Sequence, residues 1–160
     1  MIFLYKQGGE KIKNRIKKSV TILVVMIMVF AMPLTAYAAT QTKNATTKMS
    51  VALMPGASGN TNTVNIRYTT AGTVSKIKVS APLSTHSGNA IVINSFTVTS
   101  PTGTTITMPV ATGNTATTTL FTGENLSGTW YVYANCTCYS GTTPGYSSSV
   151  YYPVSITATY

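Results

Sequence analysis

The sequence predicts an all-β protein: a single antiparallel β-sandwich, jelly-roll or immunoglobulin-like, that follows an N-terminal signal peptide. Short segments with apolar residues at every second position are separated by clusters of Gly, Pro, Asn and Ser about every 8 to 12 residues. About a third of the residues after Ala38 are Thr or Ser, and β-branched Thr favours pleated strands. No amphipathic helix pattern follows the N-terminal segment.

The N-terminal segment has the order of a secretory signal. A basic stretch over residues 6–18 precedes an apolar block over residues 22–32, then Pro33 and the small-residue site Ala36-Tyr37-Ala38. The apolar run is about half of the roughly 20 residues that a membrane-spanning helix needs, so cleavage after Ala38 is favoured over an uncleaved anchor. We therefore expect a secreted or surface-associated protein, and the long basic leader is typical of Gram-positive bacteria.

Three segments are predicted: a signal peptide over residues 1–38, a flexible leader over 39–48 and a β-sandwich domain over 49–160. The leader is polar and without periodicity. The domain has room for one core and no second domain.

The first half of the domain is predicted to contain a short strand, a turn-rich segment and a hairpin. The strand covers residues 49–54 and the turn residues 55–60. If Ala71-Gly72 forms a two-residue loop, the hairpin places Val64, Ile66 and Tyr68 on the same apolar face as Ile77 and Val79. Its other face then sets Arg67 opposite Lys76, and Asn65 opposite Lys78.

The second half continues the alternation. A strand over residues 90–99 changes its apolar phase, which indicates a bulge near Asn94. Residues 100–103 form a tight turn, and strands follow around 106–110, 115–121, 129–139 and 150–160. Trp130 is expected in the core. Pro153, on the opposite face of the last strand, indicates an edge position or a bulge.

Part of this half resembles a known family. Residues 100–104 (SPTGT), Gly123-Glu124 and residues 128–130 (GTW), followed by an alternating last strand, resemble the closing half of the P domain of proprotein convertases and related jelly-roll modules. The resemblance covers roughly residues 96–160 and implies a jelly-roll sandwich that supports or binds, without catalytic residues. It departs at residues 135–138 (NCTC), where the family usually carries acidic residues, which argues against a calcium role.

The scarcity of ionisable groups excludes most catalytic chemistry. The formal charge is +9 for the whole chain but +4 after Ala38, where Glu124 is the single acid and His86 the single histidine. Paired-carboxylate hydrolysis and a Ser-His-Asp triad lack their acids. We predict no enzyme, no catalytic residue, no metal site and no cofactor.

Tyrosines concentrated near the C-terminus are the best candidates for a binding surface. A tyrosine offers apolar area with a polar tip, which suits stacking on sugar rings or packing on a protein. Strand alternation separates Tyr131 and Tyr133 from the predicted core face. The candidate binding residues are Tyr131, Tyr133, Tyr139, Tyr146 and Tyr151, together with the basic residues Arg67, Lys76 and Lys78.

Cys136 and Cys138 are the only cysteines and are candidates for a disulfide. Two residues apart on a strand, their side chains share a face, but extended geometry holds the Cβ atoms farther apart than a disulfide needs. A strained intrachain disulfide and a reduced or half-buried pair both remain open, and an intermolecular bond is a further alternative.

The leading functional hypothesis is a secreted, non-catalytic binding or adhesion module. Its Tyr-rich surface would meet an extracellular glycan, a cell-wall polymer or a surface protein, while nucleic acid is not expected and no membrane span remains after cleavage. The alternatives are a self-associating structural surface protein, which would form homo-oligomers, and a small cationic antimicrobial or toxin.

Overall fold

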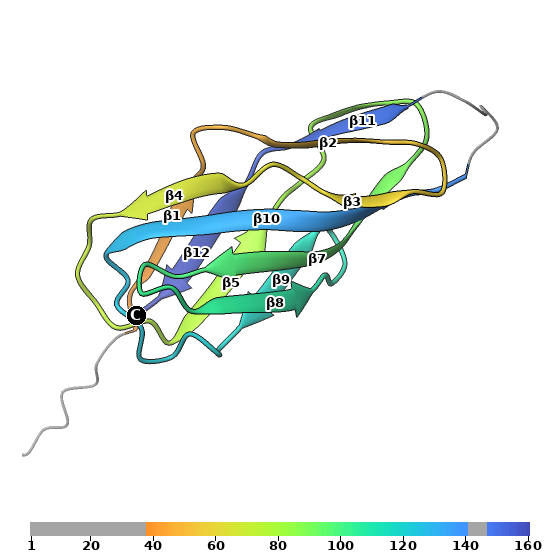
Figure 1. The fold of residues 1–160 in the computed structure, drawn as a ribbon. Helices are drawn as coiled ribbons and strands as arrows, with labels where there is room; N and C mark the ends of the chain where they lie inside the picture. Colours follow the sequence, from red (N-terminus) through yellow and green to blue (C-terminus); the bar gives the residue numbers. More distant parts are fainter. Residues whose placement is uncertain (1–37, 141–146) are drawn as a thin grey trace, which may run out of the picture. The chain divides into compact units, whose positions relative to one another are not determined.

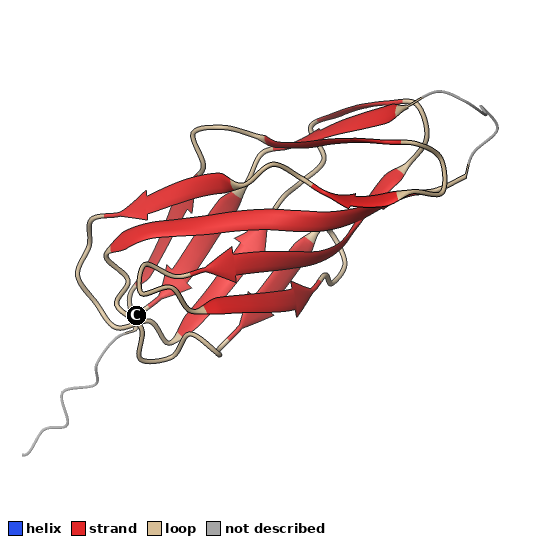
Figure 2. Ribbon diagram, viewed as in Figure 1, coloured by secondary structure: helices blue, strands red, loops and turns tan. Residues whose placement is uncertain are grey.

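The structure, a computed structural model, describes residues 38–140 and 147–160. These residues form strands and turns without a helix, which confirms the predicted all-β class (Figure 2). The strands, in chain order, are β1 (Thr40–Asn44), β2 (Met49–Leu53), β3 (Ser58–Asn60), β4 (Val64–Tyr68), β5 (Lys76–Ser80), β6 (Thr85–Ser87), β7 (Ile91–Thr99), β8 (Thr105–Pro109), β9 (Thr115–Thr118), β10 (Gly128–Cys138), β11 (Ser148–Tyr152) and β12 (Ser155–Thr159) (Figure 1). Residues 1–37 of the predicted signal peptide lie outside the described residues.

The strands form three antiparallel sheets. The five-stranded sheet has the order β3-β10-β7-β8, and β4 also pairs with β10. The four-stranded sheet has the order β1-β12-β5-β9, and the three-stranded sheet the order β2-β11-β6. The chain passes between these last two sheets at residues 45–48, residues 81–84 and Pro153-Val154. They therefore form one bent layer, which packs across the core from the five-stranded sheet (Figure 1).

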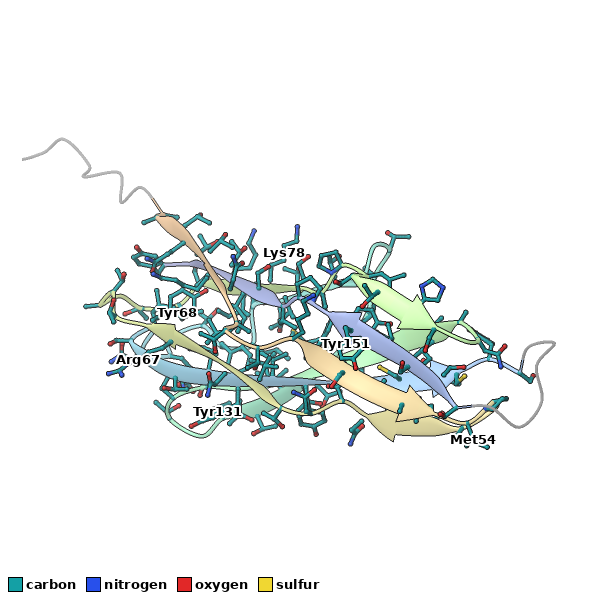
Figure 3. The ribbon with its side chains drawn as sticks, turned by 90° about the horizontal axis from the view of Figure 1, so that it is seen from above. Met54, Arg67, Tyr68, Lys78, Tyr131 and Tyr151 are labelled. Carbon is teal, nitrogen blue, oxygen red and sulfur yellow. The ribbon has the colours of Figure 1, made fainter. Side chains whose placement is uncertain are left out.

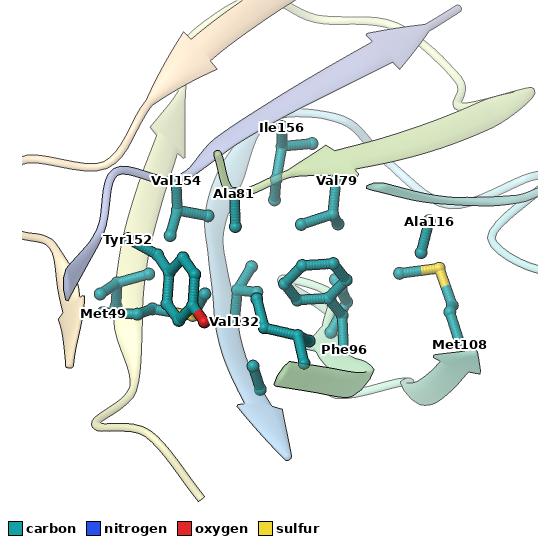
Figure 4. Packing of buried hydrophobic residues seen from close by; sticks show 14 of the residues in the cluster. Met49, Val79, Ala81, Phe96, Met108, Ala116, Val132, Tyr152, Val154 and Ile156 are labelled. Carbon is teal, nitrogen blue, oxygen red and sulfur yellow. The ribbon is translucent and has the colours of Figure 1, made fainter. Parts of the chain in front are cut away.

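Apolar side chains from both layers fill the core. Phe96 and Val132 of the five-stranded sheet face Val79 and Ile156 of the four-stranded sheet (Figure 4). Trp130 is fully buried, as predicted, and its ring meets Phe121 edge-on at a centroid distance of 5.1 Å. Its indole nitrogen donates to the carbonyl of Leu126 at 2.9 Å, which satisfies the one polar atom of the ring. Burial at every second strand residue therefore reflects the inner faces of the two layers, which pack against each other.

The predicted hairpin is wrong, although its apolar face is right. β4 pairs with β10, where Ile66 lies opposite Trp130, whereas β5 pairs with β12 and β9. Val64 and Ile77 are both buried, but they face the core from opposite layers. The connecting loop instead pairs with a later turn, because the N–H of Val74 donates to the carbonyl of Glu124 at 2.9 Å.

Two further expectations require correction. Residues 39–48 are not a flexible leader, because β1 pairs along its length with β12 and the backbones of Ala39 and Tyr160 exchange hydrogen bonds. The last strand is not continuous, because Pro153 has no backbone N–H to continue a ladder and the chain changes sheets there.

The predicted bulge and tight turn are confirmed. β7 and β10 shift register so that Ser95 lies opposite Asn135 and Ile93 opposite Cys136, which leaves Asn94 as the extra residue. In the turn after β7, the N–H of Gly103 donates to the carbonyl of Ser100 at 3.0 Å. The bulge returns Phe96 to the core side after Ile93.

Candidate functional site

Of the predicted tyrosines, the structure brings together Tyr131 and Tyr133. Both point outward from the middle of β10, where Tyr131 is 47% exposed and Tyr133 is half-buried. Tyr139 follows the end of β10 and is 59% exposed, about 20 Å along the strand from Tyr133. Tyr151 belongs to β11 in the other layer, and Tyr146 lies outside the described residues. The predicted cluster is therefore a pair, with one distant member just after the end of the same strand.

Hydroxyl and amide side chains surround this pair. The outward-pointing side chains of the five-stranded sheet form a surface that we call the hydroxyl-amide face, and within it Thr97 is buried, with 6% of its area exposed. Its central rows, read across paired strands, are Asn65–Tyr131–Thr99–Thr105 and Tyr133–Thr97–Thr107, flanked by Arg67–Thr129 at one end and by Asn60–Asn135–Ser95–Pro109 and Ser58–Thr137–Val92 at the other.

Hydrogen bonds between neighbouring strands hold these side chains in place. Thr97 shares a hydrogen bond of 2.9 Å with Thr107, and Thr99 shares one of the same length with Thr105. Such cross-strand Thr pairs stabilise a sheet by a few tenths of a kcal/mol to about 1 kcal/mol each. They also fix the hydroxyl positions beside Tyr131 and Tyr133.

The bulge contributes the other half of the network. The side-chain amide of Asn94 donates to Asn135 Oδ1 at 2.9 Å and to Thr137 Oγ1 at 2.8 Å. Asn135 in turn donates to Asn60 Oδ1 at 3.0 Å. Sequence reasoning located the bulge but missed this network.

The face is almost uncharged. Arg67 is its one ionisable residue with a formal charge, and it lies at the end of the face opposite Thr129. Aromatic rings beside fixed neutral donors and acceptors suit a neutral ligand rich in hydroxyl or amide groups. Apart from Arg67 at its end, the face offers nothing that would neutralise a strongly acidic or basic ligand.

The predicted basic face does not form. Arg67 lies on the outer side of the five-stranded sheet, while Lys76 and Lys78 lie on the outer side of the four-stranded sheet. Figure 3 shows Lys78 on the opposite side of the molecule from Arg67 and Tyr131. The prediction failed because it depended on pairing β4 with β5, and the structure places these strands in different layers.

The two cysteines are buried free thiols. They are alternate residues of β10, and their side chains face the core. No disulfide joins them, because extended geometry holds the Cβ atoms of alternate strand residues farther apart than a disulfide needs. Burial raises the pKa of the Cys136 thiol to about 11, which suppresses its reactive thiolate at neutral pH. Neither thiol reaches the hydroxyl-amide face.

Glu124 links two loops of the fold through hydrogen bonds to its carboxylate. Its carboxylate accepts hydrogen bonds from the hydroxyls of Thr102, Thr104 (2.5 Å) and Ser100 (3.3 Å). The bond from Thr102 and then the one from Thr104 hold the pKa of Glu124 below its ordinary value. The residue therefore joins the 100–104 turn to the loop before β10.

Residues 38–140 and 147–160 contain no group of three or more His, Cys, Asp or Glu side chains arranged to hold a metal ion. Over the same ranges, no helix is long and apolar enough to cross a membrane.

Comparisons with known proteins give distant structural likenesses. No protein-family model and no curated protein matches the chain. FLHE, in its crystal structure, shares 13% sequence identity with this chain and has a TM-score of 0.44. The match covers 77% of this chain and 98% of FLHE. A serine protease of Aeromonas sobria is 15% identical, with a TM-score of 0.42, over 69% of this chain and 27% of the protease. The VP2 subviral particle of infectious bursal disease virus is 14% identical, with a TM-score of 0.40, over 77% of this chain and 33% of VP2.

These likenesses carry no argument about function, since all three TM-scores are below 0.5. The chain spans about a quarter of the protease and a third of VP2. None of the three is described as a P domain, so the resemblance to that family stays a prediction.

Proposed function

We propose that this protein is an exported, non-catalytic binding module whose ligand is a neutral glycan. The ligand surface is the hydroxyl-amide face. The observation that carries the proposal is the placement of Tyr131 and Tyr133 two residues apart on β10, inside a hydrogen-bonded array of Thr and Asn side chains. The predicted signal peptide supports an extracellular glycan rather than a cellular metabolite.

The two tyrosines suit neighbouring sugar rings. Residues two apart on a strand project from the same face about 7 Å from each other. Each phenol ring offers apolar area against the C–H face of a sugar, and its hydroxyl offers a hydrogen bond at the rim. Tyr131 and Tyr133 can therefore contact successive units of one extended chain.

The surrounding side chains add specificity at small entropic cost. Thr99, Thr105 and Asn135 are already held by hydrogen bonds in the free protein. Ordering a free side chain at an interface costs about 0.5–1.5 kcal/mol, and a preorganised array avoids part of that cost. A neutral polyhydroxyl ligand can exchange hydrogen bonds with this array without burying a charge.

The non-catalytic part of the proposal rests on Glu124. It is the only side-chain carboxylate after Ala38, and three hydroxyls already hold it beside the 100–104 turn. General acid–base cleavage of a glycosidic bond uses two carboxyl groups. A wide hydrolase screen that returns activity lost on His86→Ala would overturn this part.

The test is a depletion assay of the full chain with insoluble cellulose, chitin and β-1,3-glucan. The Tyr131→Ala/Tyr133→Ala double variant should lose at least about ten-fold in affinity for the polymer that the wild type binds. Tyr151→Ala is the matched control, because Tyr151 has the same exposed fraction as Tyr131, 47%, but lies in the other layer. Equal losses in both variants, or no binding to any neutral polymer, would contradict the proposal.

Self-association is a second candidate, favoured by β9. This strand ends the four-stranded sheet, and its residues Thr115–Thr118 contain neither the charge nor the proline that commonly protects an edge. Leu120, just after it, is 73% exposed. If copies join along this edge, Leu120→Lys should convert an oligomer to a monomer in size-exclusion chromatography. A wild-type monomer would exclude this candidate.

A further inference from the structure

The bent layer has a groove on it that sequence analysis did not identify. The groove has a volume of about 310 Å³ and is lined by residues 44–48, Pro82 and residues 153–155. These are the places where the chain leaves one sheet of the layer for the other. Pro82 and Pro153 cannot donate to a strand ladder, so the ladders stop at this crease and leave a hollow.

Lys48 gives the groove a positive charge. Its ammonium donates to Ser84 Oγ at 3.0 Å, which links the start of β2 to the connection between β5 and β6. In the described part of the chain the only side-chain carboxylate is Glu124, and its oxygens are already bound by Ser100, Thr102 and Thr104. The charge of Lys48 therefore has no side-chain counter-ion there.

The groove continues into a basic sheet surface. Asn44 and Ser155, which line it, pair with each other, and Ser155 also pairs with Ser80 of β5. Lys78 lies two residues before Ser80 and therefore points to the same side, about 7 Å further along the strand. Lys76 follows in the next row, opposite Thr159. Lys48, Lys78 and Lys76 thus follow one another from the groove outward.

We propose that this groove and the lysines beside it bind a linear anionic polymer with a sugar or polyol backbone. An anionic group of the polymer lies at Lys48, and the following groups meet Lys78 and Lys76. Pro82 and Pro153, which are both exposed, offer apolar contact to the carbon backbone of the unit in the groove. A single exposed cation contributes little, so a repeating anion fits three spaced lysines better than a small anion does.

This site is independent of the proposed function. It lies on the bent layer, while Tyr131 and Tyr133 lie on the outer face of the five-stranded sheet. The same molecule could then hold a neutral chain on one side and an anionic chain on the other. Loss of one activity leaves the other in place.

The test measures binding of the full chain to poly(glycerol phosphate) and to polygalacturonate at several salt concentrations. Lys48→Gln should weaken binding by about five-fold or more. It should also reduce the magnitude of the negative slope of log affinity against log salt by about one. Lys76→Gln/Lys78→Gln should lower that slope further. With this dependence on the lysines, binding of one polymer alone supports the proposal and identifies the anion, and binding of both supports it and shows that the site accepts either anion.

Arg67→Gln is the matched control, because it removes one positive charge from the opposite face. It should change the affinity by less than about two-fold. The proposal is overturned if Arg67→Gln and Lys48→Gln weaken binding equally, which would mean attraction by net charge alone. It is also overturned if neither polymer binds, including the case in which vesicles of anionic phospholipid bind instead.

Discussion

The hydroxyl of Tyr68 donates a hydrogen bond of 2.6 Å to the backbone carbonyl of Ile156 across the core. Tyr68 belongs to the five-stranded sheet and Ile156 to the four-stranded sheet, so this bond ties the two layers together. Burial raises the pKa of Tyr68 well above its ordinary value, and the donor therefore stays protonated over the physiological range.

Tyr68→Phe should lower the free energy of unfolding by about 1–2 kcal/mol, because it removes a buried hydrogen bond while keeping the ring. Urea unfolding measures this loss. Polymer binding by the folded variant should be unchanged, since Arg67 and Asn65, on the other side of β4, keep their register with β10. A variant as stable as the wild type would show that the bond between the layers contributes nothing.

Glu124 should make stability depend on acid pH. Because its folded-state pKa is below the ordinary value of 4.5, its contribution is present above pH 4.5 and is lost as the pH falls through the folded-state pKa. Glu124→Gln should be less stable at pH 7 and should show a shallower loss below pH 4.5. Thermal unfolding between pH 3 and 7 measures both, and identical acid profiles for the two proteins would refute this role.

Cys136 should make stability depend on alkaline pH. Its folded-state pKa is about 11, against an ordinary value of 9.0, so the unfolded chain releases this proton first as the pH rises. Stability should fall between pH 9 and 11 by up to about 1.4 kcal/mol per pH unit. Tyr152, whose pKa burial raises to about 12 with a smaller effect from Cys136, adds to the fall above pH 10.

Cys136→Ala is the control for this dependence. It should be less stable at neutral pH because it removes a buried side chain, but its stability should fall less between pH 9 and 10.

The native wild type should also resist alkylation at pH 7.5 and react at both thiols once unfolded. Rapid alkylation of the folded protein would contradict the burial of Cys136 and Cys138.

Inward-facing residues could be predicted from the sequence because burial in a strand repeats every two residues. Val64, Ile66, Ile77 and Val79 were all placed on an apolar face and are all buried. Their pairing could not be predicted, since two apolar strands satisfy the same pattern side by side in one sheet or opposite each other across a core. The seven residues between β4 and β5 decide this by pairing with the loop around Glu124.

The edge strand β1, the tyrosine pair and the groove at Lys48 were also only partly predictable from the sequence. β1 was missed because none of its five residues is buried, so its sequence carries no apolar alternation. The positions of Tyr131 and Tyr133 followed from alternation along one strand. Lys48 was missed because its groove forms only where three separate connections meet.

We propose above that the hydroxyl-amide face binds a neutral glycan. This claim is tested most directly by backbone amide chemical shifts during titration with soluble oligosaccharides of the polymer selected in the depletion assay. The largest changes should occur at Tyr131, Tyr133 and their register neighbours Asn65, Thr97 and Thr99. Changes centred on Tyr151 or on the groove at Lys48, with the amides of β10 unaffected, would contradict the claim.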